Sequence, residues 1–240
     1  MNTPRCGMVD HHIAPLEDTK WNKTDLTYYY YSYTPDMPRS DLERLTKRAF
    51  QYWSDETPLT FTEIKSGDIV IAFGSRAHRD DRKKCVYHFH GKGTTLAHAF
   101  LPPDGRLHFN EDELFTDRST SGINYLWVAT HEMGHVLGLE HDTKNKDAVM
   151  YPYYKAYVPN MKLHANDVYR IQKQYGKSTG GGSNTKPPKT VPPTHPVTKP
   201  TQAGCFDQSV NCDDFKQRCN GDQKWINFMK TNCKKTCNFC

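Results

Sequence analysis

The segment His131-Glu-Met-Gly-His135-Val-Leu-Gly138-Leu-Glu-His141 constrains the fold of this 240-residue chain more than any other feature. His131 and His135 are one helical turn apart, so both imidazoles project from one face of a helix and can bind one Zn²⁺. Gly138 permits the backbone conformation that ends the helix and turns the chain back, so that His141 supplies a third nitrogen. The alternative is a helix in which three of the chain's twelve histidines fall at this spacing by chance.

Glu132 directly follows the first of these histidines. Three protein ligands leave the fourth tetrahedral position of Zn²⁺ to a water molecule, and the metal lowers the pKa of that water. Glu132 is placed to accept the water's proton. The segment therefore predicts a catalytic zinc centre in which Glu132 is the general base of a hydrolytic reaction.

Cysteine is concentrated at the end of the chain, where six of the eight cysteines lie in the last 36 residues. A segment this short cannot bury enough apolar surface to fold without cross-links, and disulfides form in oxidising compartments. We therefore expect a disulfide-rich module over residues 205–240 and a secreted, extracellular protein. Six cysteines can pair in many ways, and their spacing alone does not choose among them.

Residues 177–204 contain six of the fifteen prolines and no aromatic residue, which predicts a Thr/Pro/Gly linker between two folded parts. The first ten residues are polar and lack the apolar stretch of a signal peptide. We therefore expect that a secretion signal either precedes this sequence in a longer chain or has been removed from it.

Charge and hydropathy exclude two classes of protein. The formal net charge is +5, but the linker contributes four lysines without an acid, and residues 205–240 contribute six basic against four acidic residues. Residues 1–176 therefore carry about −1, which argues against a nucleic-acid partner. The longest apolar run, residues 69–73, is far shorter than the roughly 20 residues of a membrane span.

The pattern between the N-terminus and the linker predicts an α+β domain. An alternating stretch at 26–33 is typical of a strand, and Ser40-Asp-Leu-Glu43 is a capping box that opens a helix. That helix carries Leu42, Leu45, Ala49 and Trp53 on one face. Further strands are expected at 69–73 and 96–100, and helices at about 123–137 and 165–175.

Beyond the histidine segment, the chain resembles the metzincin zinc peptidases, and within them the matrix metalloproteinases (matrixins), over residues 4–176. Ala148-Val-Met150-Tyr-Pro152 is similar to the family's Met-turn, in which Met150 would form an apolar floor beneath the zinc ligands. The resemblance implies a twisted mixed sheet with three helices. It also implies a secreted zinc endopeptidase that cuts internal peptide bonds of protein or peptide substrates, above all those of the extracellular matrix.

Pro4-Arg-Cys6-Gly-Met-Val-Asp10 is similar to the family's cysteine switch. The resemblance implies that Cys6 is a fourth ligand of the catalytic zinc, which would exclude the catalytic water and make the chain latent. Residues 1–14 would then be the remnant of a propeptide, and residues 15–176 the catalytic domain. The alternative is a disulfide between Cys6 and Cys85, the two cysteines outside the tail.

The resemblance also implies a second, structural zinc. Its four ligands would be His78, Asp80, His98 and His108. A closed set of four ligands adds folding energy and leaves no position for substrate. The resemblance does not decide whether the chain binds Ca²⁺, because several aspartates of the family's calcium sites are replaced here. Asp68 and Glu113 remain as oxygen ligands, whereas a hard cation needs several.

By the same resemblance, Trp127 faces the pocket that receives the substrate side chain just after the scissile bond. Pro152 and Tyr154 would form the opposite wall of that pocket. A bulky indole would make the pocket shallow and favour Leu, Ile or Met there. The alternative is that Trp127 only packs in the core of an amphipathic helix.

Residues 205–240 resemble the ShK toxin-like (ShKT) domain. The family implies three disulfides, Cys205–Cys240, Cys212–Cys233 and Cys219–Cys237. Asn227 and Phe228 stand where the toxins carry the Lys-Tyr pair that blocks potassium channels, so we expect the module to bind an unknown ligand or to localise the peptidase. One alternative is a cap without a partner. The other is a venom-type binding protein that acts through this module and uses the metal domain as a scaffold.

Overall fold

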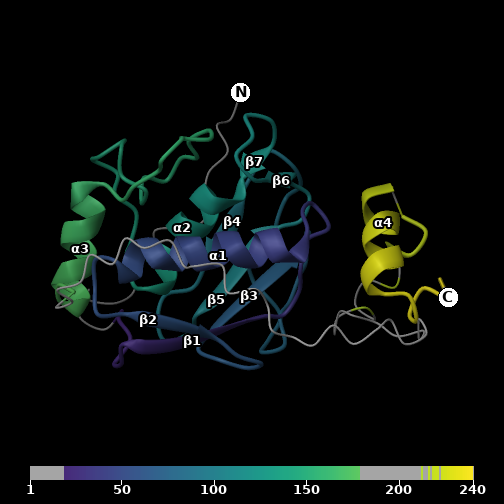
Figure 1. Ribbon diagram of the computed structural model, residues 1–240, viewed down its shortest axis with the longest axis horizontal. Coiled ribbons are helices and arrows are strands. Elements are labelled where there is room, and N and C mark those ends of the chain that lie inside the picture. Colours follow the sequence, from purple (N-terminus) through teal and green to yellow (C-terminus); the bar gives the residue numbers. More distant parts are fainter. Residues whose placement is uncertain (1–18, 179–211, 213–215, 217, 222, 240) are drawn as a thin grey trace, which may run out of the picture. The chain divides into compact units, whose positions relative to one another are not determined.

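The computed structural model of the chain describes residues 19–178, 212, 216, 218–221 and 223–239 (Figure 1). The chain divides into two units, Met1–Ser178 and Thr179–Cys240. Each is described below by itself. Within the described residues, no helix is long and apolar enough to cross a membrane.

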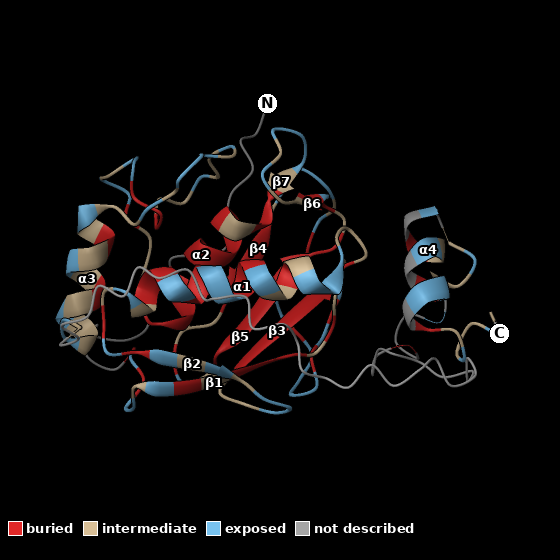
Figure 2. Cartoon of the chain, in the orientation of Figure 1, coloured by how far each residue is buried: buried red, intermediate tan, exposed pale blue. Residues whose placement is uncertain are grey.

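A five-stranded sheet with the order β2-β1-β3-β5-β4 lies at the centre of the first unit (Figure 1). Its strands are β1 (Asp25–Tyr30), β2 (Thr60–Glu63), β3 (Ile69–Gly74), β4 (Ala97–Ala99) and β5 (Arg106–Asn110). Four strands run parallel, and β4 pairs antiparallel with β5. The sheet is therefore mixed, as the family resemblance implies. Figure 2 shows that β3, β4 and β5 are the buried strands.

Three helices and a short strand pair complete this unit. They are α1 (Arg39–Ser54), α2 (Tyr125–Val136), α3 (Ala165–Tyr175), β6 (Phe115–Thr116) and β7 (Ile123–Asn124). Helix α1 packs along α2, and α2 also contacts β4 and β5. Every residue of α2 except Leu126 is buried, so its histidines lie inside the protein and not on a solvent-facing surface.

The apolar face predicted for α1 is present, since Leu42, Leu45, Ala49 and Trp53 are all buried. The predicted capping box is wrong. The helix begins at Arg39, and the carbonyl of Pro38 already accepts hydrogen bonds from the backbone N–H groups of Asp41 and Leu42. Ser40 therefore lies within the first turn and caps nothing.

Two strand predictions also need correction. Strand β1 ends at Tyr30, short of the predicted residue 33. Beyond it, the Ser32 hydroxyl replaces the strand pairing, because it accepts the backbone N–H of Phe73 at 2.7 Å and donates to the carbonyl of Phe73 at 2.8 Å. Strand β5 is absent from the sequence prediction. Its alternate residues Arg106, His108 and Asn110 are polar yet fully enclosed, so the strand lacks the apolar pattern of a core strand.

The second unit contains α4 (Gln223–Asn232) and two disulfides. These are Cys212–Cys233 and Cys219–Cys237, two of the three pairs that the ShKT resemblance implies. The third pair, Cys205–Cys240, lies outside the described residues. Trp225 and Met229 of α4 are buried, so this small unit has a few apolar side chains inside its cross-links.

Candidate metal centres

The histidines of the 131–141 segment form a single cluster. Helix α2 carries His131 and His135, and their Nε2 atoms lie 3.1 Å apart. One ring nitrogen from each of these two residues and from His141 falls within 4.8 Å of the others. The structure therefore brings together the three predicted ligands of the catalytic zinc.

Backbone carbonyls set which nitrogen of each helical imidazole faces the cluster. His131 Nδ1 lies 2.6 Å from the carbonyl of Val149, and His135 Nδ1 lies 2.7 Å from that of Leu139. A carbonyl can only accept, so each Nδ1 carries the proton and each Nε2 offers a lone pair. Burial lowers the pKa of His131 to about 3, with the nearby His141 adding to the effect. Both helical imidazoles are neutral at pH 7, as metal binding requires.

Gly138 ends α2 in the way the sequence predicts. Its φ of +94° lies in the left-handed region, and a side chain here would overlap the backbone carbonyl of Thr19. The reversal brings Leu139 back under the helix, where its N–H donates to the carbonyl of Gly134. The chain then leads directly to His141.

The Met-turn, residues 148–152, lies against the same helix. A side chain on Gly134 would overlap the sulfur of Met150, so the methionine packs directly against the backbone of α2. Asp167 of α3 accepts the backbone N–H groups of Val149 and Met150 at 2.8 and 3.2 Å. The turn that carries the carbonyl bonded to His131 is therefore held by a buried carboxylate.

Trp127 lies one turn before His131 on α2. Its ring stacks on that of His131, with centroids 5.5 Å apart, and meets the ring of Tyr154 edge-on at 5.3 Å. The Tyr154 hydroxyl accepts the backbone N–H of Asn124 at 2.7 Å, which fixes the Tyr154 side chain to the start of α2. A cavity of about 390 Å³ adjoins Trp127 and is also lined by Val158 and other residues. Pro152 takes no part in these ring contacts or in the hydrogen bond to Asn124.

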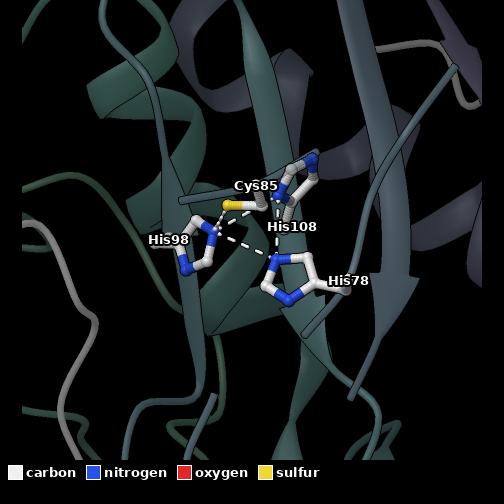
Figure 3. A group of neighbouring side chains, drawn as sticks. All are labelled: His78, Cys85, His98 and His108. Atoms are coloured by element: carbon white, nitrogen blue, oxygen red, sulfur yellow. Dashed lines mark hydrogen bonds between the residues drawn. The ribbon is translucent and has the colours of Figure 1, made fainter. Parts of the chain in front are cut away.

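A second cluster lies between β4, β5 and the loop after β3 (Figure 3). It contains His78, His98 and His108, three of the four ligands predicted for a structural zinc, together with Cys85. Burial lowers the pKa of His78 to about 4, so this imidazole is neutral at pH 7. Burial raises the pKa of the Cys85 thiol.

Comparison with known proteins identifies the larger unit. Residues 20–176 match the family model described as Matrixin. The chain belongs to the matrixin family. Residues 204–240 match a second model, described as ShK domain-like.

Several curated relatives are similar to this matrixin. Macrophage metalloelastase of Rattus norvegicus is 45% identical over 202 residues, which cover 80% of the chain and 42% of the relative. Hatching enzyme of Paracentrotus lividus is 40% identical, over 77% of the chain and 31% of the relative. Matrilysin of Homo sapiens is 44% identical, over 74% of the chain and 67% of the relative. The chain thus spans less than half the length of the first two.

The matrixin family implies zinc, and the residues of the first cluster fit it. Zinc in proteins prefers imidazole nitrogens, and three of them here converge within bonding reach of one ion. Glu132 is fully buried beside the first ligand. Three protein ligands and a neighbouring carboxylate are the arrangement of a catalytic zinc site, whereas a structural site has four protein ligands.

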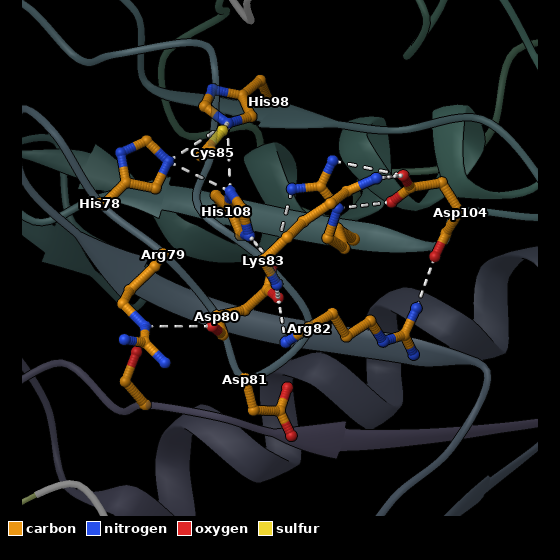
Figure 4. Close-up of polar contacts among 12 residues, drawn as sticks. His78, Arg79, Asp80, Asp81, Arg82, Lys83, Cys85, His98, Asp104 and His108 are labelled. Carbon is orange, nitrogen blue, oxygen red and sulfur yellow. Dashed lines mark hydrogen bonds and ion pairs between the residues drawn. The ribbon is translucent and has the colours of Figure 1, made fainter.

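Asp80 lies outside the second cluster, although the family resemblance implies that it is a ligand. Its Oδ2 lies 2.7 Å from Nε2 of His108, whereas Nδ1 of that ring faces the other histidines. Asp80 is fully buried, and its Oδ1 accepts the backbone N–H groups of Arg82 and Lys83. Figure 4 shows this aspartate on the side of His108 away from Cys85.

The two residues considered for calcium are engaged within the protein. The Asp68 carboxylate accepts both the backbone N–H and the hydroxyl of Thr27 at 2.8 Å and pairs with Lys23 at 2.6 Å. Glu113 accepts the backbone N–H of Gly93 at 2.6 Å. Among the described residues, neither belongs to a group of three or more donors that could hold an ion.

The guanidinium of Arg82 binds backbone carbonyls around Asp68. Arg82 donates to the carbonyl oxygens of Gly67, Asp68 and Asp104 at 2.6, 2.9 and 2.5 Å. Arg106 pairs with the carboxylate of Asp104 at 2.6 Å from its buried position in β5. This part of the matrixin domain is therefore held together by cationic side chains of the chain itself.

Sequence reasoning missed the roles of Cys85, Asp167 and Arg82. Cys85 was considered only as a partner of Cys6, and its buried thiol is free in the structure. Its position seven residues after His78 was the available signal. Cys6 itself lies outside the described residues.

Proposed function

We propose that this matrixin is a zinc-dependent endopeptidase that hydrolyses internal peptide bonds of extracellular proteins. The observation that carries the proposal is that three imidazoles converge beside Glu132, a buried carboxylic acid residue of α2. Its membership of the matrixin family and its similarity to a macrophage metalloelastase support the same reaction class.

The residues divide the chemistry between them. Zn²⁺ held by His131, His135 and His141 would lower the pKa of a water molecule and polarise the scissile carbonyl. Glu132 takes the proton of the attacking water and passes it to the leaving amine. The carbonyls of Val149 and Leu139 keep the two helical imidazoles oriented throughout.

The competing proposal is a binding protein that uses the metal domain as a scaffold and acts through residues 205–240. Glu132 argues against it, because a scaffold needs the three histidines but not a buried carboxylate beside them. We propose that the ShK-like module has a function separate from catalysis, which is to bind an extracellular ligand and so localise the peptidase. Its match to a ShK domain-like model and its cross-links support this.

The reaction class is tested with a proteome-derived peptide library incubated with organomercurial-treated protein. We expect cuts at internal bonds that disappear with a zinc chelator and return with added Zn²⁺. An absence of cuts in protein that has bound zinc would leave the scaffold alternative standing.

We further propose that Cys6 keeps the chain latent by taking the fourth position on the catalytic zinc. The free, buried thiol of Cys85 supports this reading over a Cys6–Cys85 disulfide. Cys6→Ser should raise peptidase activity at least about tenfold without an activator, because a hydroxyl is a far poorer zinc ligand than a thiolate. An organomercurial should do the same to the unchanged protein. Intact-mass analysis that finds Cys6 bonded to Cys85 would refute the switch.

Trp127 is proposed to set the depth of the pocket after the scissile bond. Its stacking on His131 keeps the indole beside the metal centre, and the cavity of about 390 Å³ adjoins it. Trp127→Leu should admit longer side chains after the cut, with a gain of roughly 10- to 200-fold in kcat/KM because each added methylene buried is worth about 1–3 kcal/mol.

The control for this change is Trp127→Phe, which keeps an aromatic ring in place. Cleavage of a peptide with Ala after the cut should change little in either variant, since Ala does not reach the indole. Library profiles that are the same for all three proteins would mean that Trp127 is core packing only.

A further inference from the structure

The second cluster is built from two antiparallel pairs of residues. His98 and His108 stand opposite each other in the register of β4 and β5. Cys85 donates its backbone N–H to the carbonyl of His78 at 3.0 Å, across a turn closed by the Arg79–Lys84 bridge. Backbone pairing thus brings four metal-binding side chains to one point, and Figure 3 shows all four directed toward it.

The distances within the cluster match a metal site. His78 Nε2, His98 Nε2 and His108 Nδ1 are separated by 3.1 to 3.3 Å, and Cys85 Sγ lies 3.2 Å from His98 Nε2. Tetrahedral zinc with Zn–N bonds of about 2.0 Å and a Zn–S bond of about 2.3 Å needs donor separations of about 3.3 to 3.6 Å. All four donor atoms lie within 4.8 Å of one another, so small shifts of the side chains are enough to admit the ion.

Two neighbours direct the ring nitrogens inward. The carbonyl of Arg76 lies 2.9 Å from His78 Nδ1, which must donate, so Nε2 keeps its lone pair for the cluster. Asp80 plays the same part for His108. Its carboxylate accepts from Nε2 and leaves the lone pair of Nδ1 facing the other histidines.

Both carboxylate oxygens of Asp80 already accept hydrogen bonds outside the cluster. Its Oδ2 serves His108, with Arg106 at 3.8 Å, and its Oδ1 serves the turn through the backbone N–H groups of Arg82 and Lys83. Moving the carboxylate to the metal would break the turn and release His108. Cys85, in contrast, already lies within the cluster, and its side chain is enclosed.

We propose that Cys85 is the fourth ligand of the second zinc and that Asp80 is a positioning residue acting through His108. The site is then a closed set of three imidazoles and one thiolate. This donor set favours Zn²⁺ and excludes Ca²⁺ and Mg²⁺, which prefer oxygen ligands. The inference rests on the second zinc and is independent of whether the protein cuts peptides.

The test uses the full chain with Cys6→Ser and Glu132→Ala. The first change removes the other thiol outside the tail, and the second prevents self-digestion. In this protein, loaded with two Co²⁺ ions, we expect a sulfur-to-cobalt charge-transfer band in the near ultraviolet. With two Zn²⁺ ions, X-ray absorption should report one sulfur per two metals, at about 2.3 Å.

Two further substitutions distinguish ligand from positioning residue. Cys85→Ser should abolish the band and weaken the second metal's affinity by more than 100-fold. Asp80→Asn should keep the band and weaken affinity by about 10- to 100-fold, because it only loosens the orientation of His108. If Cys85→Ser does not fold, the spectra of the protein that keeps Cys85 still show whether a sulfur binds one of the two metals.

Three results would overturn the inference. Two bound metals without a sulfur ligand would mean that oxygen closes the site. A band that survives Cys85→Ser would assign the sulfur to the tail. Binding of a single metal would refute the second zinc altogether, and the peptidase proposal would still stand or fall on the library experiment.

Discussion

Glu132→Ala is expected to fold and to bind zinc with little change, yet to lose at least about 10²- to 10⁴-fold in kcat/KM, the usual contribution of a general acid–base group. The three imidazoles and the carbonyls that orient them are untouched by the change. Only the carboxylate that moves the proton is removed. The measurement is kcat/KM on a peptide taken from the library, in a Cys6→Ser background, with zinc content measured on the same samples.

Glu140→Ala is the matched control. This glutamate lies just beyond α2 and is partly exposed, and it accepts a hydrogen bond from Arg170 through its backbone carbonyl, which the substitution keeps. It should keep nearly all activity. Near-normal turnover by Glu132→Ala would refute the mechanism, whereas equal loss in both variants would point to damage at the end of the helix.

Asp167→Ala is expected to lower the free energy of unfolding by roughly 3–5 kcal/mol. The fully buried carboxylate accepts the backbone N–H groups of Val149, Met150 and His164. Without it, these donors stay buried, and each one left unsatisfied costs about 1–3 kcal/mol. Zinc affinity should fall as well, because the carbonyl of Val149 orients His131. Denaturant unfolding and zinc competition measure the two effects.

Asp147→Ala removes an aspartate from the same stretch of chain. Its side chain is 87% exposed and pairs with Lys155 at 2.8 Å, so the change should leave the midpoint of denaturant unfolding almost unchanged. Asp167→Asn keeps one acceptor oxygen and should fall between the two. A cost for Asp167→Ala as small as that for Asp147→Ala would mean that the Met-turn needs no such anchor.

The first metal site could be predicted because its information is local. His131, His135, Gly138 and His141 span eleven residues. Helical geometry brings the first two histidines together, and the reversal that Gly138 permits brings His141 to them. The apolar face of α1 was predictable for the same reason, since period 3.6 is a property of one segment.

The second site was only partly predictable because backbone pairing assembles it from three separate stretches. Nothing in the spacing of His78, Asp80 and Cys85 says which of the last two faces the histidines. That depends on the turn at residues 79–84, where the carboxylate of Asp80 accepts hydrogen bonds from backbone N–H groups and from His108. Strand β5 could not be predicted for a related reason. Its polar residues are buried only because the folded chain encloses them, and the sequence pattern does not show this.

The guanidinium of Arg82 has a consequence for how this protein meets its surroundings. A dissolved ion leaves its site when the medium is depleted of it, but a cation tethered to the backbone has a fixed local concentration. The carbonyls of Gly67, Asp68 and Asp104 therefore keep their hydrogen bonds to Arg82 whatever the divalent-ion content of the surrounding fluid. The loop that joins β4 to β5 should accordingly hold its shape in fresh water as in blood or sea water.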